Sequence, residues 1–184
     1  MFGRPPLCGR PTIRPVTGPR PLAFDAIAEA RRQWEARGWP AAGAMSAATS
    51  IMRAAQIVTA RMDEALRPFD LSFARYEALV LLCFSRTGAL PLGKMGDRLM
   101  LHPTSVTNIV DRLEAQGFAV RTKHPTDRRT TLAEITPEGR RVTEKATEAV
   151  SAANIGMGAL AGDDLDAVTD ALRPLRIDFG DFPG

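Results

Sequence analysis

The chain has 184 residues, of which 45% are hydrophobic and 24% charged, as expected for one folded domain with a short extension. This composition excludes a collagen-like chain, a wholly disordered chain and a disulfide scaffold. No apolar run approaches the ~20 residues of a membrane span, and the first residues lack the apolar core of an export signal. The two cysteines, Cys8 and Cys83, fit a reducing compartment. We therefore expect a cytoplasmic protein without a membrane partner.

The net charge of +3 is unevenly distributed along the chain. It is +4 over residues 1–40, +1 over 41–67, +3 over 68–145 and −5 over 146–184. Such asymmetry hints at an anionic partner for the basic segments.

Residues 1–21 contain six prolines, which fix φ and remove backbone donors, so neither a helix nor a central strand is expected. We predict a flexible basic arm there, serving either as a plain tail or as an arm that touches DNA. Residues 22–37 are rich in good helix formers and predict a helix, which Gly38 and Pro40 end.

Two longer helices follow in the prediction. Residues 46–67 carry an apolar stripe with a 3.6-residue period, with Ser46 as the expected N-cap and Pro68 as the stop. Residues 72–86 are apolar nearly all round, which is typical of a helix buried on most sides.

The next segments predict a helix-turn-helix followed by a hairpin. Helices are expected at 91–99 and 103–116, with Pro103 in the first turn of the second and Gly117 just past its end. The stretches 118–123 and 130–136 then read as two short strands around a polar loop.

The C-terminal part predicts two more helices. One begins at Thr136 and Pro137 and runs to about Asn154, and a short one covers 163–173 and ends at Pro174. The expected fold class is mainly α with a small β-hairpin wing, that is, a winged helix-turn-helix.

The second helix of the pair has an apolar face and an opposite face of short polar side chains. Hydroxyls and amides near a helix N-terminus approach phosphates and base edges closely, an Asn pairs with adenine, and loop arginines enter a minor groove or clamp phosphates. The alternative is a solvated polar face and a surface loop. The candidate DNA-binding residues are Thr104, Ser105, Thr107, Asn108, Arg112, Arg128 and Arg129, with Asp127 as a brace of the loop. Arg112 alternatively helps to anchor the wing.

The stretch HPTSVTNIVDRLEAQGFAVRTKHPTDRRTTLAEITPEGR resembles the MarR family of bacterial transcription regulators. The family pattern is a Ser-x-Thr recognition helix, DRLE-x-x-G, an Arg, D-R-R and an L-T-x-x-G helix start. The matching residues are Ser105 and Thr107; Asp111 to Glu114 and Gly117; Arg121; Asp127, Arg128 and Arg129; and Ile135, Thr136 and Gly139. Ile135 stands where leucine is usual, which is a conservative departure. The resemblance covers about residues 45–175.

The resemblance implies a homodimer on double-stranded DNA, with N- and C-terminal dimerisation helices around the winged helix. Two winged helices would then meet successive major grooves of a pseudo-palindrome. The expected plan is a flexible basic arm at 1–21, an extra helix and linker at 22–44, a dimerisation helix at 45–67, the winged helix at 68–136, and dimerisation helices with a tail at 137–184.

The resemblance also implies a small aromatic or phenolic effector bound between the dimer base and the winged helix, with no cofactor and no metal. The expected wall consists of helices 46–67 and 72–86 and the start of the helix near 92–99. The candidate lining residues are Met52, Gln56, Met62, Tyr76 and Phe84. A stripe of this kind is alternatively plain core.

Other forms of control have less support in the residues. Trp34 and Glu77 stand where urate-responsive relatives have a tryptophan and an acid, but the arginine of those relatives is not matched. Cys83 lies in an apolar run, so we expect it to be buried and unreactive. His102 and His124 lack metal-ligand spacing.

The function predicted is that of an operator-binding transcriptional regulator, in the commoner case a repressor, released by its effector. The alternative is a winged-helix interaction module or antirepressor without an operator of its own. No nucleophile–base set, paired carboxylates or phosphate loop indicates an enzyme.

Overall fold

The computed structural model describes residues 22–127 and 129–183. The predicted arm at 1–21, with Cys8, and the wing residue Arg128 therefore lie outside the described residues. The chain divides into two compact units, and the boundary falls inside one helix, between Ile51 and Met52. Among the helices of the described ranges, none has the length and apolar character needed to span a bilayer.

The first unit contains α1 (Ala26–Ala36) and the beginning of α2 (Ala42–Leu66). The predicted helix at 22–37 starts four residues late, because the Asp25 carboxylate accepts hydrogen bonds from the amides of Ile27 and Ala28 and so caps α1. The connecting loop is held by Trp34, whose Nε1 donates to the Pro40 carbonyl at 2.8 Å. The Trp34 ring also meets the Trp39 ring edge-on, with centroids 5.0 Å apart.

Ser46 is not the N-cap of α2, contrary to the sequence prediction. The helix begins four residues earlier, and the Ser46 carbonyl accepts a hydrogen bond from the Ser50 hydroxyl within it. Ala42, Ala44 and Met45 are good helix formers and extend the helix, despite Gly43, past a residue that would otherwise cap it.

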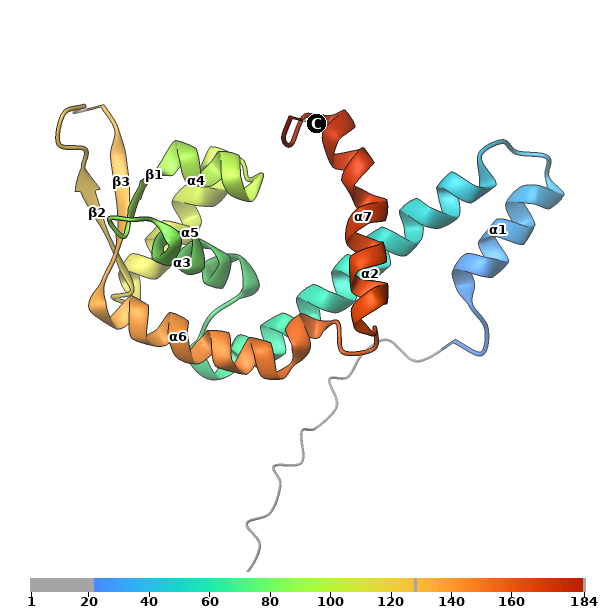
Figure 1. Cartoon of the computed structure of the whole chain (residues 1–184), viewed down its shortest axis with the longest axis horizontal. Helices are drawn as coiled ribbons and strands as arrows, with labels where there is room; N and C mark the ends of the chain where they lie inside the picture. The colour runs from blue at the N-terminus through green and yellow to red at the C-terminus, as the bar shows by residue number, and fades with distance from the viewer. Residues whose placement is uncertain (1–21, 128, 184) are drawn as a thin grey trace, which may run out of the picture. The chain divides into compact units, whose positions relative to one another are not determined.

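The second unit holds the rest of α2 and the remaining elements. They are η1 (Arg67–Phe69), α3 (Phe73–Phe84), β1 (Ala89–Pro91), α4 (Leu92–Leu99), α5 (Pro103–Ala115), β2 (Ala119–Lys123), β3 (Thr131–Ile135), α6 (Pro137–Ala152), η2 (Asn154–Gly156) and α7 (Gly162–Phe179). Of these, α3 to α7, β2 and β3 follow the predicted order, whereas η1, β1 and η2 were not predicted. The prediction of a mainly helical winged helix-turn-helix is confirmed (Figure 1).

The sheet is antiparallel with the strand order β1-β3-β2. In β2 and β3 Arg121 pairs with Ala133 and Lys123 with Thr131, so the two strands form an antiparallel hairpin (Figure 1). Strand β1 was not predicted, because three residues ending in a proline are too short to show a period. It pairs with β3 as an edge strand, where a proline is tolerated.

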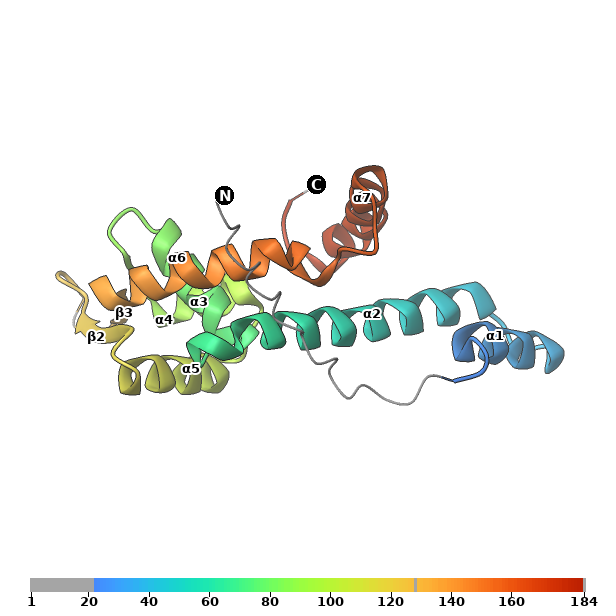
Figure 2. The same cartoon turned by 90° about the horizontal axis from the view of Figure 1, so that it is seen from below.

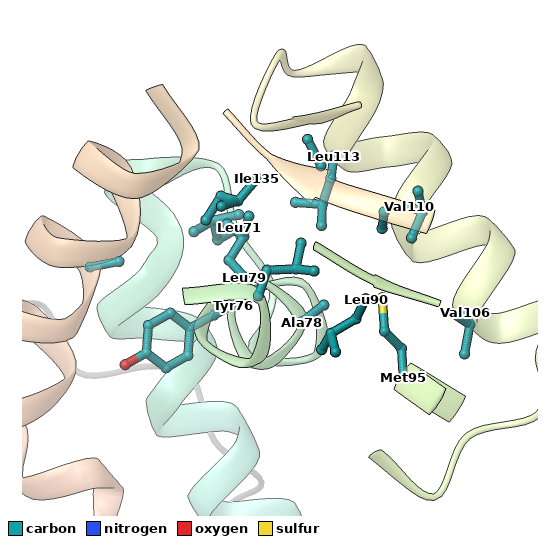
Figure 3. Packing of buried hydrophobic residues seen from close by; sticks show 14 of the residues in the cluster. Leu71, Tyr76, Ala78, Leu79, Leu90, Met95, Val106, Val110, Leu113 and Ile135 are labelled. Atoms are coloured by element: carbon teal, nitrogen blue, oxygen red, sulfur yellow. The ribbon is translucent and has the colours of Figure 1, made fainter. Parts of the chain in front are cut away.

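The core of the winged helix lies where α3, α5 and the sheet meet. Figure 2 shows α3 and α4 between α6 on one side and α5 on the other. Ten of the buried side chains are labelled in Figure 3, and Tyr76 stands at the edge of the cluster with its hydroxyl turned away from Leu79. That hydroxyl is hydrogen-bonded to Thr147 of α6 at 3.0 Å.

Helix α6 starts in close contact with the beginning of β2. The Thr136 hydroxyl donates to the Gly117 carbonyl at 2.7 Å and accepts from the Gly139 amide at 2.9 Å. A Cβ at Gly139 would collide with the carbonyl oxygen of Phe118. Glycine at this position is therefore what lets α6 approach the wing so closely.

Helix α7 does not end at Pro174, contrary to the prediction. The helix continues to Phe179 and ends at Gly180 in the left-handed conformation. The guanidinium groups of Arg173 and Arg176 stack on the Phe182 ring, at 5.3 and 5.0 Å from its centroid. These contacts stabilise the last turns and help offset the hydrogen bond lost at the proline.

Candidate nucleic-acid interface

Helix α5 presents one apolar and one polar face. Val106, Val110 and Leu113 are buried against the rest of the winged helix (Figure 3). The side chains on the opposite face, at spacings of three and four residues, are exposed to solvent. They are Thr104, Ser105, Asn108 and Arg112. An exposed stripe of this kind fits the width of a DNA major groove.

The start of α5 is capped by an imidazole ring. His102 Nδ1 accepts a hydrogen bond from the Thr104 amide at 3.3 Å, and Pro103 occupies the first helical position. The Thr107 hydroxyl donates to the Pro103 carbonyl at 3.0 Å. Thr107 is exposed, but its hydroxyl is therefore available to a ligand only as an acceptor.

Arg121 of β2 joins the wing to α5. Its guanidinium forms an ion pair with Asp111 at 2.7 Å, forms a second with Glu114, and donates to the Thr107 carbonyl at 3.2 Å. Its backbone amide also donates to Glu114 at 2.6 Å. This Arg121 latch pairs one positive charge with two carboxylates on the polar side of α5, and it joins the helix to the wing.

The turn of the wing is organised around Asp127. The carboxylate accepts hydrogen bonds from the Arg129 amide at 3.0 Å and from the Thr130 hydroxyl at 2.6 Å. These two bonds, with the Thr130 hydroxyl first, lower the pKa of Asp127 below its ordinary value. His124 Nδ1 accepts from the Asp127 amide at 3.2 Å, and Arg129 is exposed beside this turn.

A groove of about 700 Å³ runs between the wing and the first turn of α4. Lys94, His124 and Arg129 line it, together with one acid, Asp97. Sequence reasoning did not single out Lys94, since a lysine in the first turn of a short helix carries no signal by itself. Only the pairing of β1 with β3 brings α4 beside the wing.

Two hollows flank the exposed side of α3, and both are lined by Tyr76, Val80 and Phe84. The Arg140 hollow, of about 450 Å³, lies toward α6. It is completed by Cys83, Arg140, Thr143, Glu144 and Thr147. The Glu77 hollow, of about 300 Å³, is completed by Met62, Phe73, Glu77, Leu81, Leu99, Val150 and Ile155.

The predicted effector wall is only partly assembled by the structure. Met62, Tyr76 and Phe84 line these hollows, whereas Met52 and Gln56 line neither. Both are exposed because α2 rises about 1.5 Å per residue, which carries them well beyond Met62. The contribution of α4 is Leu99 at its end, not its start. Cys83 is only partly buried, since it faces the Arg140 hollow.

Known proteins with similar sequences and structures share this arrangement of helices and wing. The model of the MarR family matches residues 75–131. The organic hydroperoxide resistance transcriptional regulator of Bacillus subtilis is 30% identical over 118 residues, which cover 64% of this chain and 78% of the relative. The crystal structure of Sco5413, a MarR family transcriptional regulator from Streptomyces coelicolor, aligns with a TM-score of 0.72 and 48% identity, over 77% of this chain and 99% of that chain.

The chain belongs to the MarR family. Its members are transcriptional regulators that bind DNA, and they are not enzymes. Not every relative is matched over two thirds of its length: YhbI of Bacillus subtilis is 35% identical over 97 residues, or 60% of its own length. CouR from Rhodococcus jostii RHA1, solved bound to p-coumaroyl-CoA, is 30% identical with a TM-score of 0.61, over 73% of this chain and 90% of that chain.

The family match coincides with the interface described above. It runs from the first turn of α3 to the first residue of β3, and so includes α5, β2 and the wing turn of this MarR-family chain. Sequence reasoning named the members of the Arg121 latch only as parts of a family pattern. Their contacts were missed, because they join a strand and a helix that no local spacing relates.

Proposed function

We propose that this MarR-family chain is a transcriptional repressor that binds a pseudo-palindromic operator as a homodimer. The observation that carries the proposal is the Arg121 latch, which holds the open polar face of α5 and the wing in one fixed geometry. A helix in the major groove beside a wing over the next minor groove needs such a fixed geometry.

In the proposed complex the exposed face of α5 reads the major groove. Asn108 pairs with a base edge, preferably adenine, while Thr104, Ser105 and Thr107 contact base edges or phosphates near the helix start. Arg112 binds a phosphate. The wing arginines, Arg128 and Arg129, enter the minor groove or clamp phosphates, and Asp127 braces their turn without touching DNA.

The homodimer is supported by apolar side chains that a single chain leaves uncovered. Helix α7 contains no buried residue, and Leu175 and Phe179 are 61% and 75% exposed. A second copy would cover them, as expected for a two-fold interface. The two recognition helices would then address half-sites about 34–36 Å apart. The acidic C-terminal segment would lie away from the DNA.

Release by a small aromatic or phenolic effector completes the proposal. The hollows beside Tyr76 and Phe84 lie between the winged helix and α6, so a molecule bound there contacts both. Their volumes suit a single-ring or slightly larger ligand. CouR, a relative of similar structure, has been solved bound to p-coumaroyl-CoA, which carries a phenolic ring. Operator control of this kind places the protein in the cytoplasm.

Selection of bound duplexes from a random pool tests the proposal. We expect a palindromic sequence bound in the nanomolar range, with affinity that falls steeply as salt is raised. Asn108→Ala should cost about 1–3 kcal/mol on that duplex and relax the preference at one position. Lys145→Ala, which removes an exposed charge on α6, is the control. Equal affinity for selected and random DNA would refute the proposal.

The second candidate function is a protein-interaction module without an operator. Arg128→Ala separates the two functions by electrophoretic mobility shift and by capture of a protein partner. An operator-binding protein should lose DNA affinity, whereas an interaction module should keep its partner.

A further inference from the structure

The two hollows beside α3 differ in charge. The Arg140 hollow contains one cation and one carboxylate, Arg140 and Glu144. The Glu77 hollow contains no arginine, lysine or histidine among its lining residues, and its only carboxylate is Glu77. The rest of its wall is formed by side chains of Met, Phe, Val, Leu and Ile together with the Tyr76 ring. An anion entering it would meet a like charge without a compensating cation.

The Glu77 carboxyl is half-buried, and this burial raises its pKa above the ordinary value. Among the ion pairs of residues 22–127 and 129–183, none includes Glu77. A carboxylate in apolar surroundings gains most from a donor or cation that arrives with a ligand.

Two charged residues of α2 near the hollow form hydrogen bonds with backbone groups. On α2, Asp63 accepts a hydrogen bond from the Phe73 amide at 2.7 Å, and Arg61 donates to the Gly156 carbonyl at 2.8 Å. The lining residues come from α2, α3, α4, α6 and η2, and of these only Tyr76 and Glu77 are titratable. The Tyr76 hydroxyl is hydrogen-bonded to Thr147.

We propose that the Glu77 hollow binds a small apolar molecule carrying a protonated amine, in preference to an aromatic acid. Its volume of about 300 Å³ lies at the lower end of the roughly 300–1,000 Å³ of ligand pockets, which suits a single ring with a short side chain. The ring packs on Phe84 and Leu99 while the ammonium group donates to Glu77. The inference rests on the proposed function only for its effect on DNA, not for the binding itself.

A matched ligand series tests this preference. Calorimetry with the full chain uses 2-phenylethylamine, 2-phenylethanol and phenylacetate, which share a ring and differ in charge. We expect the amine to bind at least about tenfold more tightly than the alcohol or the acid. Phenylacetate binding as tightly as the amine, or no measurable binding of the amine, would overturn the proposal.

Three variants locate the amine. Glu77→Gln should remove the preference for the amine while the alcohol still binds, which shows that the hollow is intact. Glu148→Gln, which removes an exposed carboxylate of α6 outside both hollows, should leave the preference unchanged. Loss of binding in Glu144→Gln instead of Glu77→Gln would place the amine in the Arg140 hollow and overturn the proposal.

The pH dependence gives a second readout. The amine stays protonated throughout the acidic and neutral range, so among the amine and the residues that line the hollow only Glu77 changes charge there. The preference for the amine should therefore be full above the raised pKa of Glu77 and weaken as pH falls through it. In Glu77→Gln the affinity for the amine should not vary over the same range; variation equal to that of the unmodified chain would contradict the assignment.

Binding and regulation are measured separately. Amine binding that depends on Glu77 but leaves operator affinity unchanged supports this inference and refutes effector release through this hollow. Absence of amine binding, with a changed dimer dissociation constant in Glu77→Gln, would mean that a second copy covers the hollow, and would overturn the inference without affecting operator binding.

Discussion

The winged helix and the helices that flank it differ in how many apolar side chains a single chain can bury. Helices α3 and α5 bury four and three residues, whereas α1 and α7 bury none. Helix α2, with 25 residues, buries only Met62 and Leu66 at its C-terminal end. The winged helix and α6 therefore bury apolar side chains within one chain, whereas α2 and α7 leave large apolar side chains such as Ile57 and Phe179 exposed.

The largest expected effect is on the stability of the winged helix, whose core a single chain buries. Leu113→Ala removes a fully buried side chain between α5 and the sheet, so it should lower the free energy of unfolding by about 2–5 kcal/mol. Urea unfolding measures this at fixed protein concentration. Val120→Thr, an isosteric change at an exposed position of β2, should stay within about 0.5 kcal/mol. A loss below about 1 kcal/mol in Leu113→Ala would break the contrast.

The next effect concerns the flanking helices. Phe179→Ser on α7 should raise the dimer dissociation constant at least about tenfold, because a large ring no longer leaves water on association. Sedimentation over a dilution series gives the constant, and hydrogen exchange at Leu113 reports whether the winged helix is unaffected. Asp170→Ser, an exposed polar change on the same helix, serves as the comparison. An unchanged constant in Phe179→Ser would show that α7 is not at the interface.

A smaller effect is expected where the winged helix holds its own geometry. Arg121→Ala leaves the Asp111 and Glu114 carboxylates without their cation near the proposed phosphate path, so operator affinity should fall about tenfold. Fluorescence anisotropy with the selected duplex measures it. Arg141→Ala removes a similar arginine, paired with Glu138 on the surface of α6, and should change the affinity little. Equal losses in both variants would mean that only overall charge matters.

The smallest effect is the acid sensitivity of the wing turn. The pKa of Asp127 is lowered in the folded protein, so the stabilisation it adds is complete above the ordinary value of about 3.9 and is lost as pH falls through the folded value. The amide signals of Arg129 and Thr130 should therefore shift only below about pH 4. Asp127→Asn should abolish this transition; the same transition in the variant would assign it to another group.

Local patterns predicted most of the winged helix, because its helices and hairpin are defined by periodicity and capping within the segment itself. Val106, Val110 and Leu113 follow directly from their spacing on α5. Strand β1 and the Arg121 latch could not be predicted in this way, since each depends on a partner distant in sequence. Helix α7 passes Pro174 because side-chain contacts at its C-terminus favour the longer helix.

The candidate sites divide similarly. The exposed residues of α5 were identified from their polarity, and their contacts with DNA remain predictions. The effector wall stays a prediction, and only three of its five residues line the hollows, because a stripe on α2 does not tell how far along the helix the neighbouring elements reach. Met62 lines a hollow, whereas Met52, ten residues earlier, is 68% exposed. Glu77 was noted only for its resemblance to an acid in relatives, and its apolar surroundings became visible only in the structure.

The close approach of Gly139 to the Phe118 carbonyl holds one end of α6 against the wing. The helix has 16 residues and is therefore about 24 Å long, with its N-terminal end fixed against the start of β2. Because the backbones touch there without a side chain between them, and the Thr136 hydroxyl also bonds the Gly117 carbonyl, we expect the start of β2 to move with the helix when the helix tilts. A tilt of about 10° would move the far end of α6 by roughly 4 Å over that length. If the hairpin moves with α6, a molecule bound beside the far end of the helix would therefore have to displace that end by about 4 Å to turn the hairpin by about 10°.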